Sequence, residues 1–263
     1  MTSPEASAVR GQSRDGLPPV RTIGFSAPFA WLAGGLSDLW RAPGPLLAYG
    51  LAMAAVSAAL CWGLYVSNLA FWVLILTFGF VFVAPILAMG PYEAGRRLER
   101  GERVSFGDIA FVRPAFRQDV AYLGLALLLI YLFWGRIAQI VFGLSTYQIY
   151  DTVDAFVAFA LHSAEGHNML LAGTLVGGVI AFFTYALVVV AAPLLLNGAS
   201  NVFVGVITSF RAVAANPGPM LLWAVILAAF ILASAATGFL AFVVVFPWLG
   251  LASWRAYRAL VAE

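Results

Sequence analysis

The chain has 263 residues, of which 63% are hydrophobic and 10% are charged, and its net charge is +2. Soluble domains usually carry about 25% charged residues, so this composition excludes an ordinary soluble globular protein. The fourteen basic residues are all arginines and are spread along the chain, which excludes a protein that binds nucleic acid through a concentrated basic surface.

Long stretches without charge indicate several membrane crossings. Residues 42–92, 166–210 and 212–254 contain no Asp, Glu, Lys or Arg. Residues 120–150 contain a single charged side chain, that of Arg136. Each of the first three stretches is long enough for two crossings, because one apolar helix needs about 20 residues. Segments such as 123–130 are apolar on all sides instead of alternating, so they indicate helices and not the strands of a barrel.

The first 22 residues precede the membrane domain, which we assign to residues 23–263. Residues 1–22 are rich in Ser, Pro, Gly and Arg and have no apolar periodicity, so we predict a disordered cytoplasmic tail. In Phe25–Arg41 and again in Val202–Phe210, apolar residues recur at steps of three and four. Such amphipathic helices either lie in the headgroup region or pack on the cytoplasmic ends of the spans.

Six transmembrane helices are predicted, arranged as three pseudo-repeated hairpins. Tight turns near residues 65–69 and 235–239 join two of the hairpins, and a longer outer loop spans residues 143–168. The spans are placed at about 46–66, 69–90, 120–142, 169–193, 219–237 and 239–257.

The arginines predict the orientation of these spans. With six spans, thirteen of the fourteen arginines fall on one side, whereas the opposite loops hold Asp151, Asp154 and Glu165. Because positively charged loops stay in the cytoplasm, we expect a multi-pass protein of the bacterial inner membrane with both termini cytoplasmic.

A repeated module is the second pattern. Residues 42–47 (APGPLL) and 216–221 (NPGPML) open the first and fifth spans, and residues 113–116 (RPAF) are a weaker counterpart before the third. Proline inside a helix removes a backbone hydrogen bond and bends the helix, although proline is also common in membrane helices generally. The even spans share a proline followed eight positions later by a polar or charged residue: Pro85 and Glu93, Pro193 and Asn201, and Pro247 and Arg255.

Arg136 is the charged candidate within a span. It lies about 16 residues into the third span, roughly 24 Å from the inner end. One interpretation is a contact with an ion or substrate, because a charge inside the membrane is costly. The other is that its guanidinium reaches the outer headgroups or pairs with Asp151 or Asp154.

No catalytic set, cofactor site or metal site is expected. The two histidines, His162 and His167, lie in the outer loop beside Glu165, so no histidine is available within a span to ligate heme. A metal site at this cluster is one interpretation, and a solvated loop is the other.

Short motifs also resemble a known family. The segments Pro28–Trp40 (PFAWLAGGLSDLW), Pro43–Pro45 and Tyr92–Glu102 (YEAGRRLERGE) resemble bacterial domain-of-unknown-function family 2189, and the resemblance covers about residues 25–260. It implies a predicted integral membrane protein of proteobacterial type, and it assigns no functional residue.

We therefore expect a protein without enzyme activity that is an accessory, assembly or scaffold protein of a membrane complex, or that interacts with lipid. The expected partners are membrane lipid or another membrane complex, and not nucleic acid. The alternative is a small-solute transporter or channel, which repeated hairpins with broken helices favour. Few polar residues lie at mid-membrane depth, which opposes that alternative. A transporter would have a water-filled cavity lined by Pro85, Pro193 and Pro247.

Overall fold

The described part of the chain is helical. The computed structural model describes residues 17–69, 84–113, 118–148, 150–198 and 201–262. Within these ranges the strand-like pairing is limited to one bridge, between Val20 and Val261, so the all-α prediction is confirmed. The helices are α1 (Ala27–Arg41), α2 (Pro43–Val66), α4 (Met89–Glu99), α5 (Phe106–Ala110), α6 (Gln118–Ser145), α7 (Val153–His162), α8 (Ala164–Val188), α9 (Ala191–Asn197), α10 (Val202–Ala215), α11 (Pro217–Ala236) and α12 (Phe242–Leu260).

Four helical segments are long and apolar enough to cross a membrane: α2, α6, α8 continued by α9, and α11. With 24 and 28 residues, α2 and α6 are about 36 Å and 42 Å long, which exceeds the roughly 30 Å of hydrocarbon in a bilayer. These four coincide with the predicted first, third, fourth and fifth spans. The predicted second span, 69–90, lies largely outside the described residues.

The predicted sixth span is a helix, α12, but it is not among the four. It carries Arg255 and Arg258 in its last two turns, and its C-terminal half is enclosed by protein. A helix surrounded by other helices does not need the continuous apolar surface that lipid requires. The six-span arrangement and the threefold repeat therefore remain predictions.

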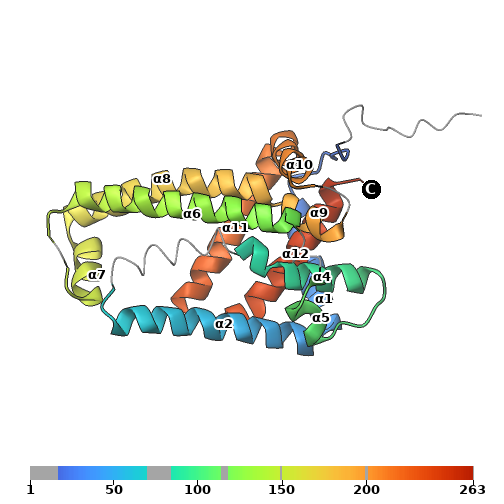
Figure 1. Ribbon diagram of the computed structural model, residues 1–263, viewed down its shortest axis with the longest axis horizontal. Helices are drawn as coiled ribbons and strands as arrows, with labels where there is room; N and C mark the ends of the chain where they lie inside the picture. The colour runs from blue at the N-terminus through green and yellow to red at the C-terminus, as the bar shows by residue number, and fades with distance from the viewer. Residues whose placement is uncertain (1–16, 70–83, 114–117, 149, 199–200, 263) are drawn as a thin grey trace, which may run out of the picture.

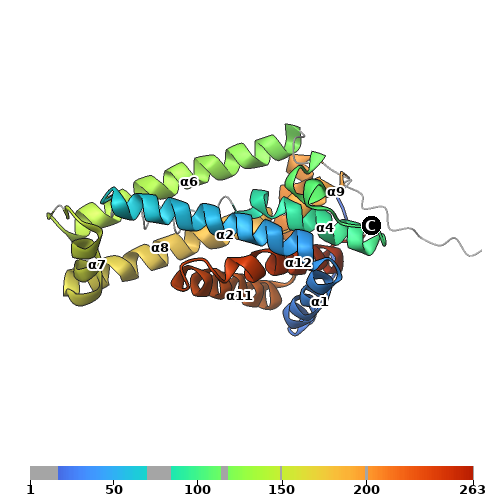
Figure 2. The same ribbon diagram turned by 90° about the horizontal axis from the view of Figure 1, so that it is seen from below.

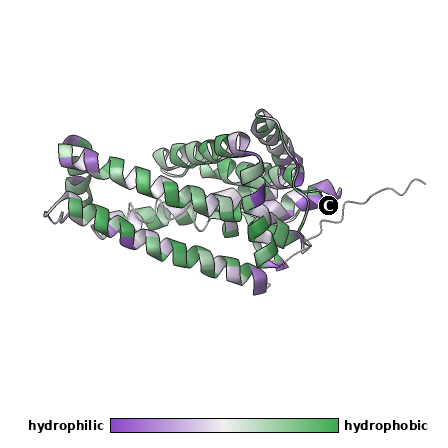
Figure 3. Ribbon diagram, turned by 90° about the horizontal axis from the view of Figure 1, so that it is seen from above, coloured by the Kyte–Doolittle hydropathy of each residue, from purple (hydrophilic) through white to green (hydrophobic). Residues whose placement is uncertain are grey.

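The four candidate spans expose large apolar side chains. In an aqueous protein this much exposed apolar surface would be unfavourable, but in a bilayer it faces lipid. Figure 3 shows the long helices as mostly hydrophobic, with hydrophilic residues gathered near their ends. Examples are Leu51, Leu60 and Trp62 on α2, Leu125, Leu129 and Phe133 on α6, Leu171, Leu175 and Phe183 on α8, and Leu221, Val225 and Leu232 on α11.

One end of the molecule is a cluster of short helices around α12. In Figures 1 and 2 the helices α2, α6 and α8 extend away from this cluster along the longest axis. We call α1, α4, α5, α9, α10 and the C-terminal half of α12 the helical cap. Residues 249–260 of α12 are largely buried against α1 and α4. Glycines permit the close approach: a Cβ at Gly35 would lie 2.7 Å from the backbone nitrogen of Ala252, and one at Gly250 would meet Pro91.

The closest contact between α2 and α12 lies one turn before a proline. Pro247 lies inside α12 and has no N–H, so the carbonyl of Val243 has no helical partner four residues later. A Cβ at Gly50 of α2 would collide with this carbonyl. Only glycine lets the backbone of α2 approach so closely.

Both ends of the described chain meet at the helical cap. Val20 pairs with Val261, and the amide of Arg21 donates to the carbonyl of Leu260 at 2.8 Å. Most of the predicted disordered tail, residues 1–22, lies outside the described residues. Its last residues are described, and Val20 and Arg21 among them pack against the C-terminal segment. Asn216 is buried and holds the same segment, because its amide group accepts from the N–H of Ile23 and donates to the carbonyl of Arg21.

The junctions before α2 and α11 have nearly the same backbone conformation. Ala42 has φ −141° and ψ 58°, and Asn216 has φ −135° and ψ 52°. Each residue connects a juxtamembrane helix to a span whose first turn contains proline, where a missing N–H is harmless. This local likeness agrees with the APGPLL and NPGPML motifs.

Candidate functional site: an apolar pocket beside the helical cap

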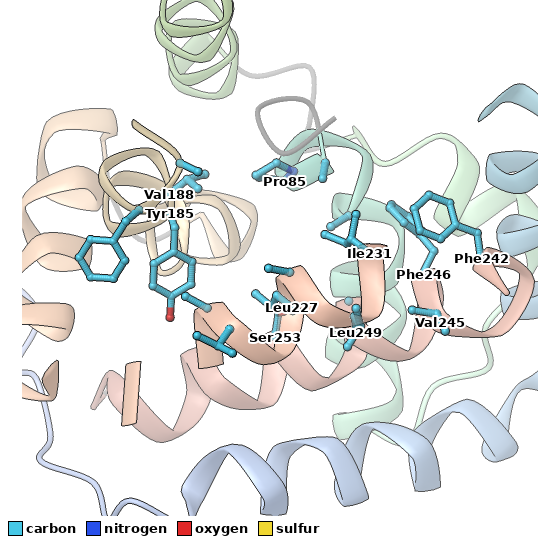
Figure 4. A pocket seen from close by; sticks show the side chains of 18 of the residues that line it. Pro85, Tyr185, Val188, Leu227, Ile231, Phe242, Val245, Phe246, Leu249 and Ser253 are labelled. Carbon is cyan, nitrogen blue, oxygen red and sulfur yellow. The ribbon is translucent and has the colours of Figure 1, made fainter. Parts of the chain in front are cut away.

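A pocket of about 430 Å³ lies between α8, α11, α12 and residues 84–92. Figure 4 shows side chains from these elements pointing into one space. The lining residues of α8 belong to its C-terminal half, and those of α11 extend from Leu221 to Ile231 across the middle of that helix. The pocket therefore begins beside the helical cap and extends to the middle of the spans.

Small residues leave the space between α8 and α11. Gly178 and Ala181 on α8 face the pocket, as do Ala224 and Ala228 on α11. A Cβ at Gly178 would meet no atom within 4 Å. The spacing of three or four residues places each pair on one side of its helix, and this spacing is the signal in the sequence from which the pocket could have been predicted.

The lining is almost entirely apolar. Leu227, Ile231 and Phe242 are among the larger side chains that form it. A buried water needs two to four polar partners, and a lining of this kind offers few. The pocket therefore suits an apolar ligand better than water or an ion.

Among the described lining residues, the polar side-chain groups are the three hydroxyls of Tyr92, Tyr185 and Ser253. Tyr185 donates its hydroxyl to the carbonyl of Met220 at 2.9 Å. Tyr92 is hydrogen-bonded with Ser253. These hydroxyls are thus already satisfied, and they lie on the segments nearest the cap.

The three prolines that the sequence singled out do not gather at one site. Pro85 lines the pocket. Pro193 is buried in the first turn of α9, after a break in the helix where the N–H of Val190 donates to Ser209 Oγ at 3.1 Å. Pro247 lies within α12 and is not part of the pocket lining.

Arg255 belongs to an ion-pair group in the cap. Its Nε and Nη2 donate to the two carboxylate oxygens of Asp38 at 2.6 and 2.9 Å. Asp38 is buried, and Arg41 adds a third contact at 3.3 Å. The sequence reasoning did not select Asp38, although its spacing from the buried Trp31 and Gly35 places it on the inner face of α1.

Glu93 is also buried and paired. Arg96 and Arg97 both donate to its carboxylate, with Nε to oxygen distances of 2.9 Å each. Arg97 then reaches Asp108 at 3.0 Å. The pKa of Asp108 is lowered, first by the hydrogen bonds from the side chain and backbone of Ser105 and further by the charge of Arg97. These contacts join α4 to α5.

The other two candidate residues have separate positions. Asn201 caps α10 and accepts from the N–H of Val204 at 2.9 Å. Arg136 is exposed on α6 and donates to Gln139 at 3.0 Å. It lies 18 residues from the start of α6, about 27 Å away, and its position near the outer boundary of the membrane stays a prediction.

The histidines do not form a ligand cluster in the described part of the chain, where no group of three or more metal-binding side chains was found. The ring of His167 instead contacts the carbonyl of Leu161 at 2.8 Å. The helices α7 and α8 begin with capping side chains from Thr152 and Ser163, so the outer loop is largely helical.

Comparison with known families supports the membrane assignment. Residues 73–197 match the model of a family described as "Predicted integral membrane protein (DUF2189)", which confirms the family resemblance. The match includes Tyr92–Glu102 and the pocket wall from α8, but it does not extend to Pro28–Trp40 or to the full 25–260 range. Neither the curated proteins nor the solved structures gave a significant match. The chain is an integral membrane protein with several apolar helices.

Proposed function

We propose that this integral membrane protein is a non-catalytic, lipid-interacting accessory protein whose pocket holds the hydrocarbon part of a membrane lipid. The observation that carries this proposal is the apolar pocket of about 430 Å³ between the spans. Its volume lies within the range of small-molecule sites, which is about 300–1,000 Å³.

The lipid that surrounds the spans is the source of a hydrocarbon chain for this pocket. An apolar space left empty loses dispersion contacts on every wall, and water entering it would find few hydrogen-bonding partners. A flexible hydrocarbon chain restores those contacts. Leu221 and Val225 line the pocket and are exposed, so a chain has access from the lipid side of α11.

The topology proposed for this function has six spans with both termini in the cytoplasm of a bacterial cell. Support comes from the meeting of both chain ends at the helical cap. Further support comes from the arginines of α4 and α12, because positive residues stay inside. The end of the pocket beside the helical cap then faces the cytoplasm.

The test uses a phospholipid with a photoreactive group in its acyl chain. Gly178→Phe places a ring in the pocket, whereas Gly173→Phe is a matched control on the same helix, because Gly173 is not part of the lining and has no neighbour within 4 Å. We expect crosslinks to the 221–231 segment of α11 in the wild type and in Gly173→Phe, and their loss in Gly178→Phe. Equal crosslinking in all three proteins, or none in the wild type, would contradict the proposal.

A small-solute transporter is the second candidate. It is favoured by the break between α8 and α9 beside Pro193 and by Pro85 in the pocket wall, because broken helices often form transport sites. Uptake assays in proteoliposomes test it. Solute accumulation that Gly178→Phe abolishes would favour this candidate over lipid binding.

A further inference from the structure

We propose that the helical cap and the segments next to it carry a surface that binds anionic phospholipid headgroups through arginines that make no ion pair with a described residue. This inference is independent of the pocket. It concerns the outside of the cap, where α1, α5 and α10 adjoin the ends of the spans.

The described arginines in the helical cap and in the segments next to it fall into two sets. Five of them are held by carboxylates: Arg41, Arg96, Arg97, Arg255 and Arg258. In the second set each side chain is exposed and makes no ion pair with a described residue. This second set is Arg21, Arg100, Arg103, Arg113 and Arg211. The cap therefore presents positive charge that its own acidic residues do not neutralise.

Exposed apolar rings accompany these cations. The clearest case is α10, where Phe203, Ile207 and Phe210 form an exposed stripe at helical spacing and Arg211 follows at once. A helix with an apolar stripe beside a cation lies well at the boundary between headgroups and acyl chains. The aromatic ring then lies among the acyl chains, and the guanidinium reaches the phosphate of a lipid headgroup.

The same pairing recurs at two other places. Phe25, 63% exposed, lies four residues after Arg21, and Phe111, 74% exposed, lies two residues before Arg113. Three segments far apart in the sequence thus carry the same combination of an exposed aromatic ring and an arginine of the second set.

The position of these groups favours lipid over an acidic protein as the partner. Arg113 lies five residues before α6, and Arg211 lies six residues before α11, both of which are candidate spans. Side chains one or two turns from the start of a span lie at the level of the headgroups. An anionic phosphate is the group available there that complements a guanidinium.

The experiment measures the binding of individual lipids to the purified full-length protein by native mass spectrometry. The probes are phosphatidylglycerol, which is anionic, and phosphatidylcholine, which is neutral overall. The variants are Arg113→Gln, Arg211→Gln and the double variant. Arg258→Gln is the matched control, because Arg258 also belongs to the cap but is paired with Glu99 at 3.0 Å.

We expect the wild type to bind phosphatidylglycerol more tightly than phosphatidylcholine, and salt to reduce the difference. Arg113→Gln and Arg211→Gln should each weaken phosphatidylglycerol binding about fivefold, while Arg258→Gln should not change it. Equal affinity of the wild type for the two lipids would overturn the inference, as would an equal loss in Arg258→Gln. Gly178→Phe should keep the preference, so failure of this inference and failure of the pocket proposal are distinguishable.

Discussion

The ion pair between Asp38 and Arg255 provides the sharpest test of the cap. The pair joins α1 to α12, and its two partners are 217 positions apart in the sequence. Replacing Arg255 with Met leaves the buried carboxylate of Asp38 with Arg41 alone, at 3.3 Å. Removing one partner of a buried pair costs about 3–5 kcal/mol. Because the Arg255 side chain is 42% exposed, we expect a smaller loss, about 2–3 kcal/mol.

Arg258 offers a control one turn further along α12. It pairs with Glu99 at 3.0 Å, but the Glu99 side chain is 46% exposed. An exposed pair contributes about 0–1 kcal/mol, so Arg258→Met should lower the stability by less than about 1 kcal/mol. For a chain of this size, 1 kcal/mol shifts Tm by roughly 2–4 °C. Arg255→Met should therefore lower Tm by roughly 4–12 °C, and Arg258→Met by less than about 4 °C.

The assay is thermal unfolding of each variant in the same mild detergent, followed by circular dichroism. A double-mutant cycle with Asp38→Asn completes it, because the second substitution removes the uncompensated charge and the losses should be less than additive. Equal Tm losses for the two arginine variants, or additive losses in the cycle, would refute the reasoning.

Three further predictions address other contacts. Gly50→Ala should destabilise the packing of α2 on α12 by about 1–3 kcal/mol, because the new methyl group meets a backbone carbonyl; Gly63→Ala, with no atom within 4 Å, should show no such loss of Tm. Asn216→Ala should release the segment before α1, which limited proteolysis will detect as faster cleavage near the N-terminus; an unchanged cleavage rate would show that other contacts hold this segment. Hydrogen exchange should find the amide of Ser105 protected at neutral pH, because it donates to Asp108 at 3.0 Å. The folded pKa of Asp108 is below its ordinary value of 3.8, so the stabilisation by the Asp108 carboxylate is present above the unfolded pKa and is lost as pH falls through the folded pKa. Asp108→Asn should abolish this pH dependence of the Ser105 protection. Protection that still depends on pH in the variant would contradict the assignment to Asp108.

The sequence predicted the spans well where lipid is the neighbour. A helix facing hydrocarbon must be apolar on most sides and must satisfy its backbone hydrogen bonds internally, so its signature is local. The segments around 46–66 and 219–237 were therefore recognised from composition alone. Hydropathy alone does not distinguish a sixth span from a buried helix at α12, because its apolar residues are explained equally well by burial among α1, α2 and α4.

The candidate residues lie at separate places in the fold. Spacing after a proline selected Glu93 and Arg255, and both are held in ion pairs of the cap. The same rule selected Asn201, which caps a helix. Equal spacing along the chain does not place residues at one site, because the site depends on how the helices turn toward one another.

The sequence by itself determined that the chain is helical, that lipid surrounds much of it, and which segments are apolar enough to cross. These properties follow from local hydropathy and from the backbone's need for hydrogen bonds. Only the tertiary structure decided that α1 and α4 enclose the end of α12, that Asp38 meets Arg255, and that small residues of α8 and α11 leave an apolar pocket. Such contacts depend on distances between residues that are remote along the chain, and no local pattern of charge or hydropathy specifies those distances.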